Sequence, residues 1–340
     1  MRIGVLTGGG DCPGLNAAIR AIVKQGITRH GSAMVGFRNG WRGVTEGDSF
    51  PLDREDVSGI LTAGGTMLGT ARFHPHKVSG ALDKVTEVFE AEKLDAFICI
   101  GGDGTLKAAH KVHTKTGIPV VGIPKTIDND VVGTDASIGF DTAVAIATEA
   151  IDRLHSTAES HNRVMGVELM GRHAGWIAVS AGIAAGADII LAPEDPFDID
   201  NVVRRITHRH RVKDFSIVAI AEGAVPEEGS DLAPDSTLDH KGNPIAGEIG
   251  RQVTEEIQKR TGFPARLTVL GYVQRGGVPT AADRLLASRF GSAAVEAVHA
   301  KEFGTFTALR GQEIVMTPLK EMAGKTNFVP PELLELARAL

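Results

Sequence analysis

Residues 95–130, DAFICIGGDGTLKAAHKVHTKTGIPVVGIPKTIDND, decide the fold that we expect for this chain. The apolar run 95–101 ends in glycines, a segment with helical spacing follows, and a second apolar run begins at residue 118. Two parallel strands need a crossover of a dozen or more residues, which is most often a helix. The stretch therefore predicts a strand, a helix and a second parallel strand, with a polar loop after each strand.

The same alternation recurs on both sides of this unit. RIGVLT precedes the helical pattern GLNAAIRAIVKQGI, and later apolar runs such as VMGVEL and FSIVAIA alternate with further helical patterns. Alternating strands and helices are typical of a parallel sheet with helices on both faces. Because 340 residues are too many for one small core, we expect an α/β protein with two doubly wound, Rossmann-like subdomains and a cleft between them.

Composition excludes several classes of protein. The chain has 42 Asp and Glu against 36 Lys and Arg, a net charge of −6, which disfavours nucleic acid as a partner. Its two cysteines, Cys12 and Cys99, have no metal-ligand spacing, so we expect buried, unpaired thiols. The short N-terminal apolar run does not resemble a signal peptide, and polar residues interrupt the longest apolar stretch. We expect a cytoplasmic protein that does not bind membranes.

Two glycine-rich loops follow predicted strands. TGGGDCPGLNAAIR and CIGGDGTLKAA each join a strand to a helix, and glycines allow a phosphate to approach the backbone closely. Asp103 lies among glycines of the second loop, where a bound phosphate would repel it unless a divalent cation lay between them. We therefore expect Asp103 to hold Mg²⁺ and Thr105 to open the helix as a cap. A tight turn without a ligand is the alternative for both loops.

The third loop, PKTIDND, has the residues that phosphoryl transfer requires. Asp128 follows a strand and lies beside Thr126 and Lys125, as expected of a general base that removes a proton from a hydroxyl. Thr126 can donate a hydrogen bond to a phosphoryl oxygen, and Asp130 is close enough to influence Asp128. A turn stabilised by local hydrogen bonds is the alternative.

Five arginines lie near glycines and predicted strand ends. Guanidinium groups suit bidentate phosphate contacts, although a solvated surface is the ordinary role of any single arginine. The five are Arg72, Arg163, Arg172, Arg266 and Arg275.

These motifs together resemble those of the 6-phosphofructokinases. GGGDCPGLNAAIR, GGTMLGTARF, GGDGT, PKTIDND, ELMGRHAGW and GYVQRGG stand in the order found in that family, from residue 2 to about residue 320. The resemblance implies transfer of a phosphoryl group to the 1-hydroxyl of fructose 6-phosphate. It also implies that Asp128 is the base and that Thr126 and Arg172 stabilise the transferring phosphoryl group.

The resemblance implies further roles, residue by residue. Residues implied to hold the donor, with Mg²⁺ at Asp103, are Gly10, Arg72, Phe73, Gly102, Asp103, Gly104 and Thr105. Residues implied to contact fructose 6-phosphate are Thr126, Ile127, Asp128, Arg163, Met170, Gly171, Arg172, Glu222, Arg266, Tyr272, Val273, Gln274 and Arg275. Tyr272 stands where many bacterial relatives have histidine, and it can donate a hydrogen bond but cannot carry positive charge.

Subunit contacts and subdomain boundaries are also implied. Arg163 and Arg266 match arginines that reach the sugar phosphate of a neighbouring subunit, so the resemblance implies a homodimer or homotetramer with shared active sites. The donor-binding subdomain is expected at 1–138 and 251–301, and the sugar-phosphate subdomain at 139–250 and 302–320. A helical extension is expected at 321–340.

The family includes members that use ATP and members that use pyrophosphate. Pyrophosphate users resemble one another in having Asp after GGD and Lys before TIDND, whereas this chain combines Gly104 with Lys125. A side chain at position 104 would intrude on the α-phosphate of a nucleotide, so Gly104 favours ATP, and Lys125 adds a charge that either donor could use.

Other functions remain as alternatives to an ATP-dependent enzyme. They are a pyrophosphate-dependent enzyme and, more distantly, a noncatalytic sugar-phosphate sensor. A nucleotide or lipid kinase would account for GGDGT but not for the other motifs.

Overall fold

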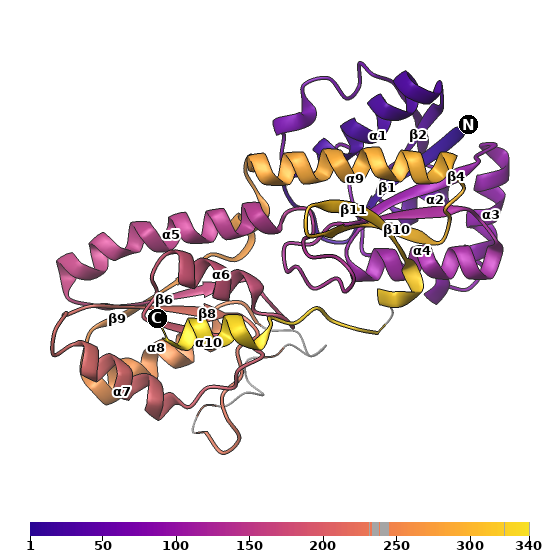
Figure 1. Cartoon of the computed structure of the whole chain (residues 1–340). Helices are drawn as coiled ribbons and strands as arrows, with labels where there is room; N and C mark the ends of the chain where they lie inside the picture. The colour runs from indigo at the N-terminus through magenta and orange to yellow at the C-terminus, as the bar shows by residue number, and fades with distance from the viewer. Residues whose placement is uncertain (231, 233–237, 239–244, 323, 340) are drawn as a thin grey trace. The chain divides into compact units, whose positions relative to one another are not determined.

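The computed structural model describes residues 1–230, 232, 238, 245–322 and 324–339. The chain divides into two compact units (Figure 1). The first unit comprises Met1–Thr142 and Arg275–Thr326, and the second comprises Ala143–Gln274 and Asn327–Leu340. The chain first crosses from one unit to the other within helix α5 (Phe140–His161).

The first unit contains a seven-stranded sheet in the order β11-β10-β5-β4-β1-β2-β3. Its five central strands are parallel, and the two edge strands β3 and β11 are antiparallel to their neighbours. The strands are β1 (Arg2–Gly8), β2 (Ala33–Phe37), β3 (Ser49–Leu52), β4 (Ala96–Gly101), β5 (Val120–Pro124), β10 (Thr305–Arg310) and β11 (Glu313–Pro318).

Helices cover both faces of this sheet because its central strands are apolar on both sides. On β4, Phe97 and Cys99 join a core with residues of α2, α3 and α4, and the alternate residues Ile98 and Ile100 face the other side. Helices α1 and α9 pack against each other (Figure 1), and α9 also contacts β4, β5 and β10. The helices are α1 (Leu15–His30), α2 (Trp41–Glu46), α3 (Ala81–Ala91), α4 (Asp103–Thr116) and α9 (Ala281–His299).

The second unit contains a four-stranded parallel sheet in the order β7-β8-β6-β9. Its strands are β6 (Val164–Leu169), β7 (Ile189–Leu191), β8 (Ser216–Ala221) and β9 (Ala265–Val269). Its helices, besides most of α5, are α6 (Trp176–Ala184), α7 (Ile199–Arg209), α8 (Glu248–Thr261) and α10 (Pro331–Ala339).

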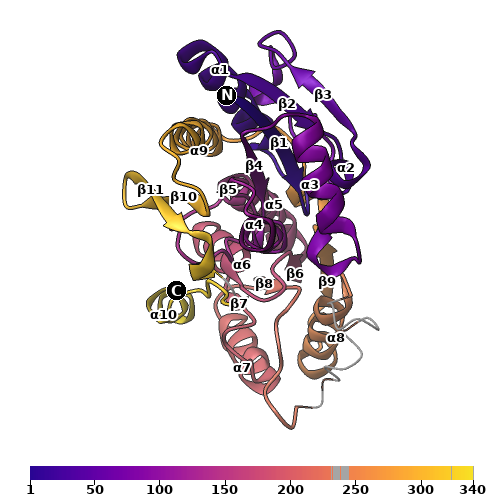
Figure 2. The ribbon, with the colours of Figure 1, turned by 90° about the vertical axis from the view of Figure 1, so that its right-hand side faces the viewer.

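Strand β7 shows how the helices of the second unit divide between the two faces. Ile189 and Leu191 belong to a core with residues of α7 and α8. Ile190, which points to the opposite face, packs with residues of α6 and α10. Figure 2 shows α7 and α8 side by side below the sheet.

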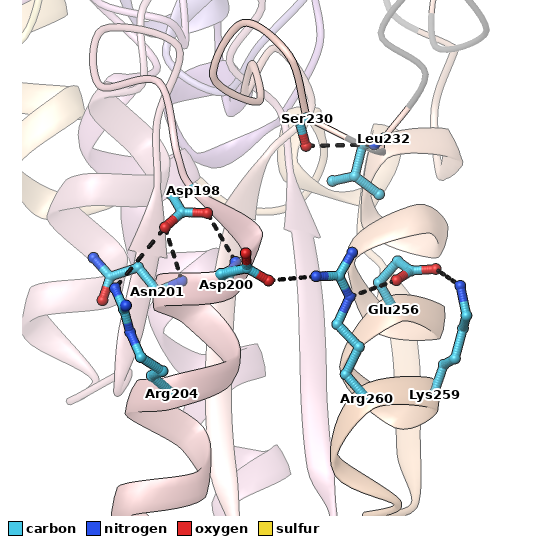
Figure 3. A network of polar contacts seen from close by, with 9 residues as sticks. All are labelled: Asp198, Asp200, Asn201, Arg204, Ser230, Leu232, Glu256, Lys259 and Arg260. Atoms are coloured by element: carbon cyan, nitrogen blue, oxygen red, sulfur yellow. Dashed lines mark hydrogen bonds and ion pairs between the residues drawn. The ribbon is translucent and has the colours of Figure 1, made fainter.

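An ion-pair network joins α7 to α8 (Figure 3). Asp198 caps α7 by accepting hydrogen bonds from the backbone N–H groups of Asp200 and Asn201. Arg260 of α8 donates one hydrogen bond to the carboxylate of Asp200. Its Nε donates a second to Glu256, at a distance of 2.7 Å. Since exposed ion pairs are each worth little, the buried apolar residues beneath them supply most of the stability of this helix pair.

The α/β fold expected from the sequence is confirmed, but two predicted boundaries are wrong. Residues 251–274 were expected in the first subdomain, yet β9 pairs with β6 of the second unit. Residues 302–320 were expected in the second subdomain, yet β10 pairs with β5 of the first. The terminal extension begins in the first unit and continues from Asn327 in the second. An apolar run predicts a strand but does not identify the neighbouring strand.

The two cysteines are buried and free, as expected. Burial raises the pKa of the Cys12 thiol to about 12, so this thiol stays protonated and behaves as a small apolar group. None of the helices within the described ranges is long and apolar enough to cross a membrane.

Candidate active site

Three polar loops meet at one edge of the seven-stranded sheet. Strands β1, β4 and β5 are parallel neighbours, so their carboxyl ends lie at the same edge. The loops that leave these ends begin at Gly8, Gly101 and Lys125. Ligands of doubly wound sheets collect at such edges because helix N-termini and backbone N–H groups point outward there.

The packing of Thr105 requires glycine at two positions in these loops. A Cβ at Gly8 would lie 2.6 Å from the Thr105 hydroxyl, and one at Gly101 would lie 2.4 Å from the Thr105 Cβ. The two strand ends therefore close around this buried threonine. The expectation that Thr105 caps the helix is wrong, because α4 begins at Asp103 and its N-cap is Gly102, without a side-chain cap.

Lys125 is buried and turns toward the first glycine loop. Its Nζ donates a hydrogen bond to the carbonyl of Gly10. Burial lowers the pKa of the lysine, and the neighbouring Arg275 lowers it further, while Asp11 and Asp128 raise it. Arg275 also lies beside this loop, with its guanidinium 3.3 Å from the carbonyl of Asp11. Two cations thus border the loop that an anionic ligand would approach.

Asp128 combines burial with nearby charges of both signs. Its Oδ1 is buried and has no hydrogen-bond partner among the described residues. The pKa of Asp128 is raised from 3.8 to about 6, chiefly by desolvation on burial and also by Asp130, while Arg275 and Lys125 oppose the shift. A carboxylate with such a pKa is suited to accept a proton near neutral pH. The backbone N–H of Asp128 donates to the Thr126 hydroxyl at 3.2 Å.

The raised pKa of Asp128 predicts a stability effect that does not depend on function. Burial makes the charged form of the carboxylate unfavourable in the folded state. The resulting loss of folding stability is absent below about pH 4 and complete above about pH 6. Asp128→Asn is expected to increase the free energy of unfolding by about 1–3 kcal/mol at pH 8 and to leave it unchanged at pH 4. Denaturant unfolding at both pH values measures this difference, and equal stabilities at pH 8 would contradict the assigned pKa.

Asn129 supports the loop from inside, and we did not predict its role from the sequence. It has a positive φ of 50°, a conformation in which asparagine is enriched. Its Oδ1 accepts from the backbone N–H of Ser137 at 3.0 Å, and its Nδ2 donates to the carbonyl of Asp135 at 3.2 Å. Ser137 in turn donates to the carbonyl of Thr126 at 2.7 Å. Ile127 is fully buried, so only its backbone can face a ligand.

The segment that contains Arg72 and Phe73 is held against the first glycine loop. Asn16 of α1 donates to the carbonyls of Ala63 and Gly64, and Thr70 donates to the carbonyl of Gly9 at 2.7 Å. Phe73 packs against the core of the first unit. Arg72 is exposed and therefore available to a ligand at this edge.

The ring of His74 occupies the space beside Gly104, so packing as well as a bound phosphate restricts the side chain at this position. A Cβ at Gly104 would lie 2.8 Å from Cε1 of His74. Burial lowers the pKa of His74, Lys77 lowers it further, and a hydrogen bond with the backbone of Gly104 opposes the shift. His74 is thus a neutral side chain that packs against the loop around Gly104. We did not predict this contact from the sequence.

Asp103 fits the role of a magnesium ligand only together with a phosphate. Its Oδ2 accepts from Nζ of Lys107 at 2.7 Å, and about a third of its side chain is exposed. The described residues contain no cluster of three or more His, Cys, Asp or Glu side chains able to hold a metal ion. Mg²⁺ commonly binds one carboxylate together with phosphate oxygens, so Asp103 suits an ion that arrives with a phosphorylated ligand.

The second unit has its own cluster at the carboxyl ends of β6 and β8. Met170, Gly171 and Arg172 follow β6, and Glu222 follows β8. The backbone N–H of Gly223 donates to the carbonyl of Gly171 at 3.1 Å. A Cβ at position 223 would lie 2.1 Å from the carbonyl oxygen of Arg172, so the two loops are packed backbone to backbone.

The predicted residues 272–274 differ in exposure. Gln274 is fully buried, and its Oε1 accepts from the backbone N–H of Met170 at 3.3 Å, so it supports the Arg172 loop. Tyr272 and Val273 are 82% and 62% exposed. These two side chains have little contact with their own unit and are available to a ligand or another chain.

Arg163 and Arg266 lie at the opposite edge of the four-stranded sheet. Arg163 immediately precedes β6, and Arg266 pairs with Met165 near the start of the same strand. Strand β6 has six residues, so Arg163 and Met170 are separated by roughly 20 Å. Within one copy of the unit, these arginines cannot join the cluster around Arg172.

Comparisons with known proteins agree on the family and differ on the phosphoryl donor. The sequence profile described as "Phosphofructokinase" matches residues 2–298. A pyrophosphate–fructose 6-phosphate 1-phosphotransferase of Amycolatopsis methanolica is 54% identical over 337 residues, 99% of this chain and 98% of the relative. ATP-dependent 6-phosphofructokinase 3 of Streptomyces coelicolor is 51% identical over 331 residues, 97% of each chain. The T-state phosphofructokinase of Pichia pastoris is 33% identical, with a TM-score of 0.84 over 94% of this chain and 35% of that one.

Proposed function

The chain belongs to the phosphofructokinase family, and on this premise we propose that it transfers the γ-phosphoryl group of ATP to the 1-hydroxyl of fructose 6-phosphate. The products are fructose 1,6-bisphosphate and ADP. The observation that carries the proposal is Asp128, whose buried Oδ1 has no hydrogen-bond partner among the described residues and whose pKa is raised to about 6, beside the cations Lys125 and Arg275. Such a group can accept a proton at neutral pH while the cations attract a phosphate.

In the proposed reaction, Asp128 removes the proton of the 1-hydroxyl as that oxygen attacks the γ-phosphorus. The new O–P bond forms while the bond to the bridging β,γ-oxygen breaks, and its electron pair leaves with ADP. Thr126 and Arg172 donate hydrogen bonds to the phosphoryl oxygens, whose charge must be stabilised during transfer. Met170, Gly171 and Glu222 orient the sugar.

The donor binds at the glycine loops of the first unit in this proposal. Backbone N–H groups of Gly10 and of residues 102–104 face the phosphates, and Arg72 and Phe73 complete the site. Thr105 shapes the loop, since its own N–H donates to the carbonyl of Gly102 at 3.0 Å. Mg²⁺ held by Asp103 would neutralise phosphate charge. Gly104 supports ATP because it adds no side chain between the α-phosphate and the ring of His74.

Pyrophosphate is the second candidate donor, and particular observations favour it. Lys125 is the lysine that the pyrophosphate users share, and the A. methanolica relative is named for pyrophosphate. That relative and the ATP-dependent one differ by only three points of identity, 54% against 51%, so identity does not separate the donors. The ring of His74 requires a glycine at position 104 with either donor. We retain ATP because the same glycine also adds no side chain beside the α-phosphate of a nucleotide.

A substitution at position 104 tests this steric argument. Gly104→Asp places a Cβ 2.8 Å from His74 and a carboxylate beside the phosphates, so we expect kcat/KM for ATP to fall by about 10²-fold. The KM for fructose 6-phosphate should change little. Steady-state kinetics with each substrate varied gives both values, and Gly104→Ala serves as the uncharged control. Unchanged ATP kinetics in the aspartate variant would remove the steric argument.

The proposal includes a homodimer or homotetramer with shared active sites. Arg163 and Arg266 lie at the wrong edge of their own sheet to join Arg172, which supports a role toward the 6-phosphate bound by a neighbouring copy. The exposed Tyr272 could be covered in the same assembly. The proposal also keeps the cytoplasmic location, since phosphorylated sugars and ATP do not cross membranes unaided.

Product analysis tests the proposed acceptor. The protein is incubated with fructose 6-phosphate, ATP and Mg²⁺, and the sugar product is identified by NMR. Formation of fructose 1,6-bisphosphate supports the proposal. Binding of fructose 6-phosphate without turnover by any donor would instead support a noncatalytic sensor.

A further inference from the structure

The loop that carries Arg172 is anchored at its far end by one carboxylate. Both oxygens of Glu194 lie 3.0 Å from the backbone N of Gly175, the N-cap residue of α6. A negative charge is favourable at this end of a helix, and here it also satisfies a backbone donor. Gly175 is closely packed, since a Cβ there would lie 2.6 Å from the Cβ of Ala192.

The same carboxylate binds the C-terminal segment, residues 327–339. Glu194 Oε1 accepts from the backbone N–H of Val329 at 3.0 Å. Trp176, the residue after Gly175, donates through Nε1 to the carbonyl of Asn327 at 2.8 Å. Gly175 is therefore linked to Val329 through Glu194, and Trp176 is bonded directly to Asn327.

The C-terminal segment is itself firmly attached. Arg338 forms two hydrogen bonds with Asp195, at 2.7 and 2.6 Å. Val329 and Ala337 join a core with Val179 and Ala192, packed further by Leu333 and Leu334. This attachment makes the segment a fixed support rather than a loose tail.

We propose that Glu194 is a positioning residue for Arg172, and that the C-terminal segment is the support against which Glu194 holds the loop. The inference rests on the proposed function, because it assigns to Arg172 the role of stabilising the transferring phosphoryl group. Only two residues separate Arg172 from Gly175, so a displacement at Gly175 reaches the guanidinium through the short run 172–175. Catalysis is sensitive to displacements of this kind even when they begin outside the chemistry.

Adjacent carboxylates provide a matched pair of variants. Glu194→Gln keeps the size of the side chain and the Oε1 acceptor that Gly175 and Val329 share. It replaces Oε2, which lies 3.0 Å from the backbone N of Gly175, by an NH₂ group that repels this N–H, and it removes the charge at the N-terminus of α6. Asp195→Asn weakens only the contact with Arg338, and the apolar core of Val329 and Ala337 together with the bonds to Glu194 and Trp176 keeps the support in place. We expect Glu194→Gln to lower kcat by about 10- to 100-fold with the KM for ATP unchanged, and Asp195→Asn to retain the kcat of the original protein.

Two further measurements separate positioning from a general loss of structure. In an Arg172→Ala background, Glu194→Gln should cause no further fall in kcat, because residues that act as a unit are not additive. Hydrogen exchange of the peptide covering 170–176 should accelerate in Glu194→Gln and not in Asp195→Asn. This exchange does not depend on turnover, so it tests the anchor even if the protein uses neither donor and the proposed function fails.

Three results would overturn the inference. One is an unchanged kcat in Glu194→Gln, and another is an equal loss in both carboxylate variants. The third is a loss from Glu194→Gln that is as large in the Arg172→Ala background as in the original protein.

Discussion

Replacing Asp128 by serine is expected to lower kcat by about 10²–10⁴-fold, the usual contribution of a general base. Serine removes the carboxylate and leaves no group that can hold the proton of the 1-hydroxyl. The KM for fructose 6-phosphate should change much less, since other residues bind the sugar in our proposal. Steady-state kinetics with ATP and Mg²⁺ measures both constants.

The stability of the Asp128 variants provides the control for this experiment. Because burial raises the pKa of Asp128, removing the charge should not destabilise the fold at pH 8. A stable but inactive variant would assign the loss to chemistry rather than to unfolding. In the original protein, kcat/KM should fall as the pH drops through about 6, where Asp128 becomes protonated. If kcat of Asp128→Ser fell by less than tenfold, Asp128 would have only a structural role in holding the loop.

Replacing Arg172 by alanine is expected to lower kcat by about 10²–10³-fold, as is typical when a charge-stabilising donor is removed from a reaction site. The guanidinium can donate two parallel hydrogen bonds to a phosphoryl group, and alanine can donate none. The loop backbone should remain in place, because Gly171 and Gly175 are held through their own backbone atoms.

Arg172→Lys is the matched variant for this prediction. Lysine keeps the positive charge but loses the planar, bidentate geometry, so its kcat should lie between those of the original protein and Arg172→Ala. If lysine restored full activity, charge alone would suffice at this position. If alanine were nearly as active as arginine, Arg172 would have no part in stabilising the transferring group.

The sequence predicted local features of the first unit well. The glycine loops, the strands before them and the polar loop around Asp128 follow from apolar runs and glycine positions. All three loops leave neighbouring parallel strands, β1, β4 and β5, so they meet at one edge of the sheet.

Long-range pairing could not be predicted in the same way. Strand β9 has only one buried residue, Ala265, and its alternation does not identify β6 as its neighbour. Strands β10 and β11 form a hairpin whose position beside β5 depends on contacts far away in the sequence. Both errors in the subdomain boundaries have this origin.

Supporting residues of the site were missed for a related reason. Asn129, His74 and Glu194 act through packing and through hydrogen bonds to distant backbone atoms. The positive φ of Asn129 had a weak sequence signal, since asparagine within a polar loop tolerates that conformation. Glu194 had none, because its partners Gly175 and Val329 are 19 and 135 residues away.

The central claim is best tested by measuring the turnover of fructose 6-phosphate with ATP and Mg²⁺ and, separately, with pyrophosphate and Mg²⁺. Equal enzyme concentrations and saturating sugar phosphate allow kcat/KM for the two donors to be compared directly. Our account predicts a higher kcat/KM with ATP. A higher value with pyrophosphate would contradict the donor assignment drawn from Gly104. It would mean that Lys125, rather than Gly104, indicates the donor.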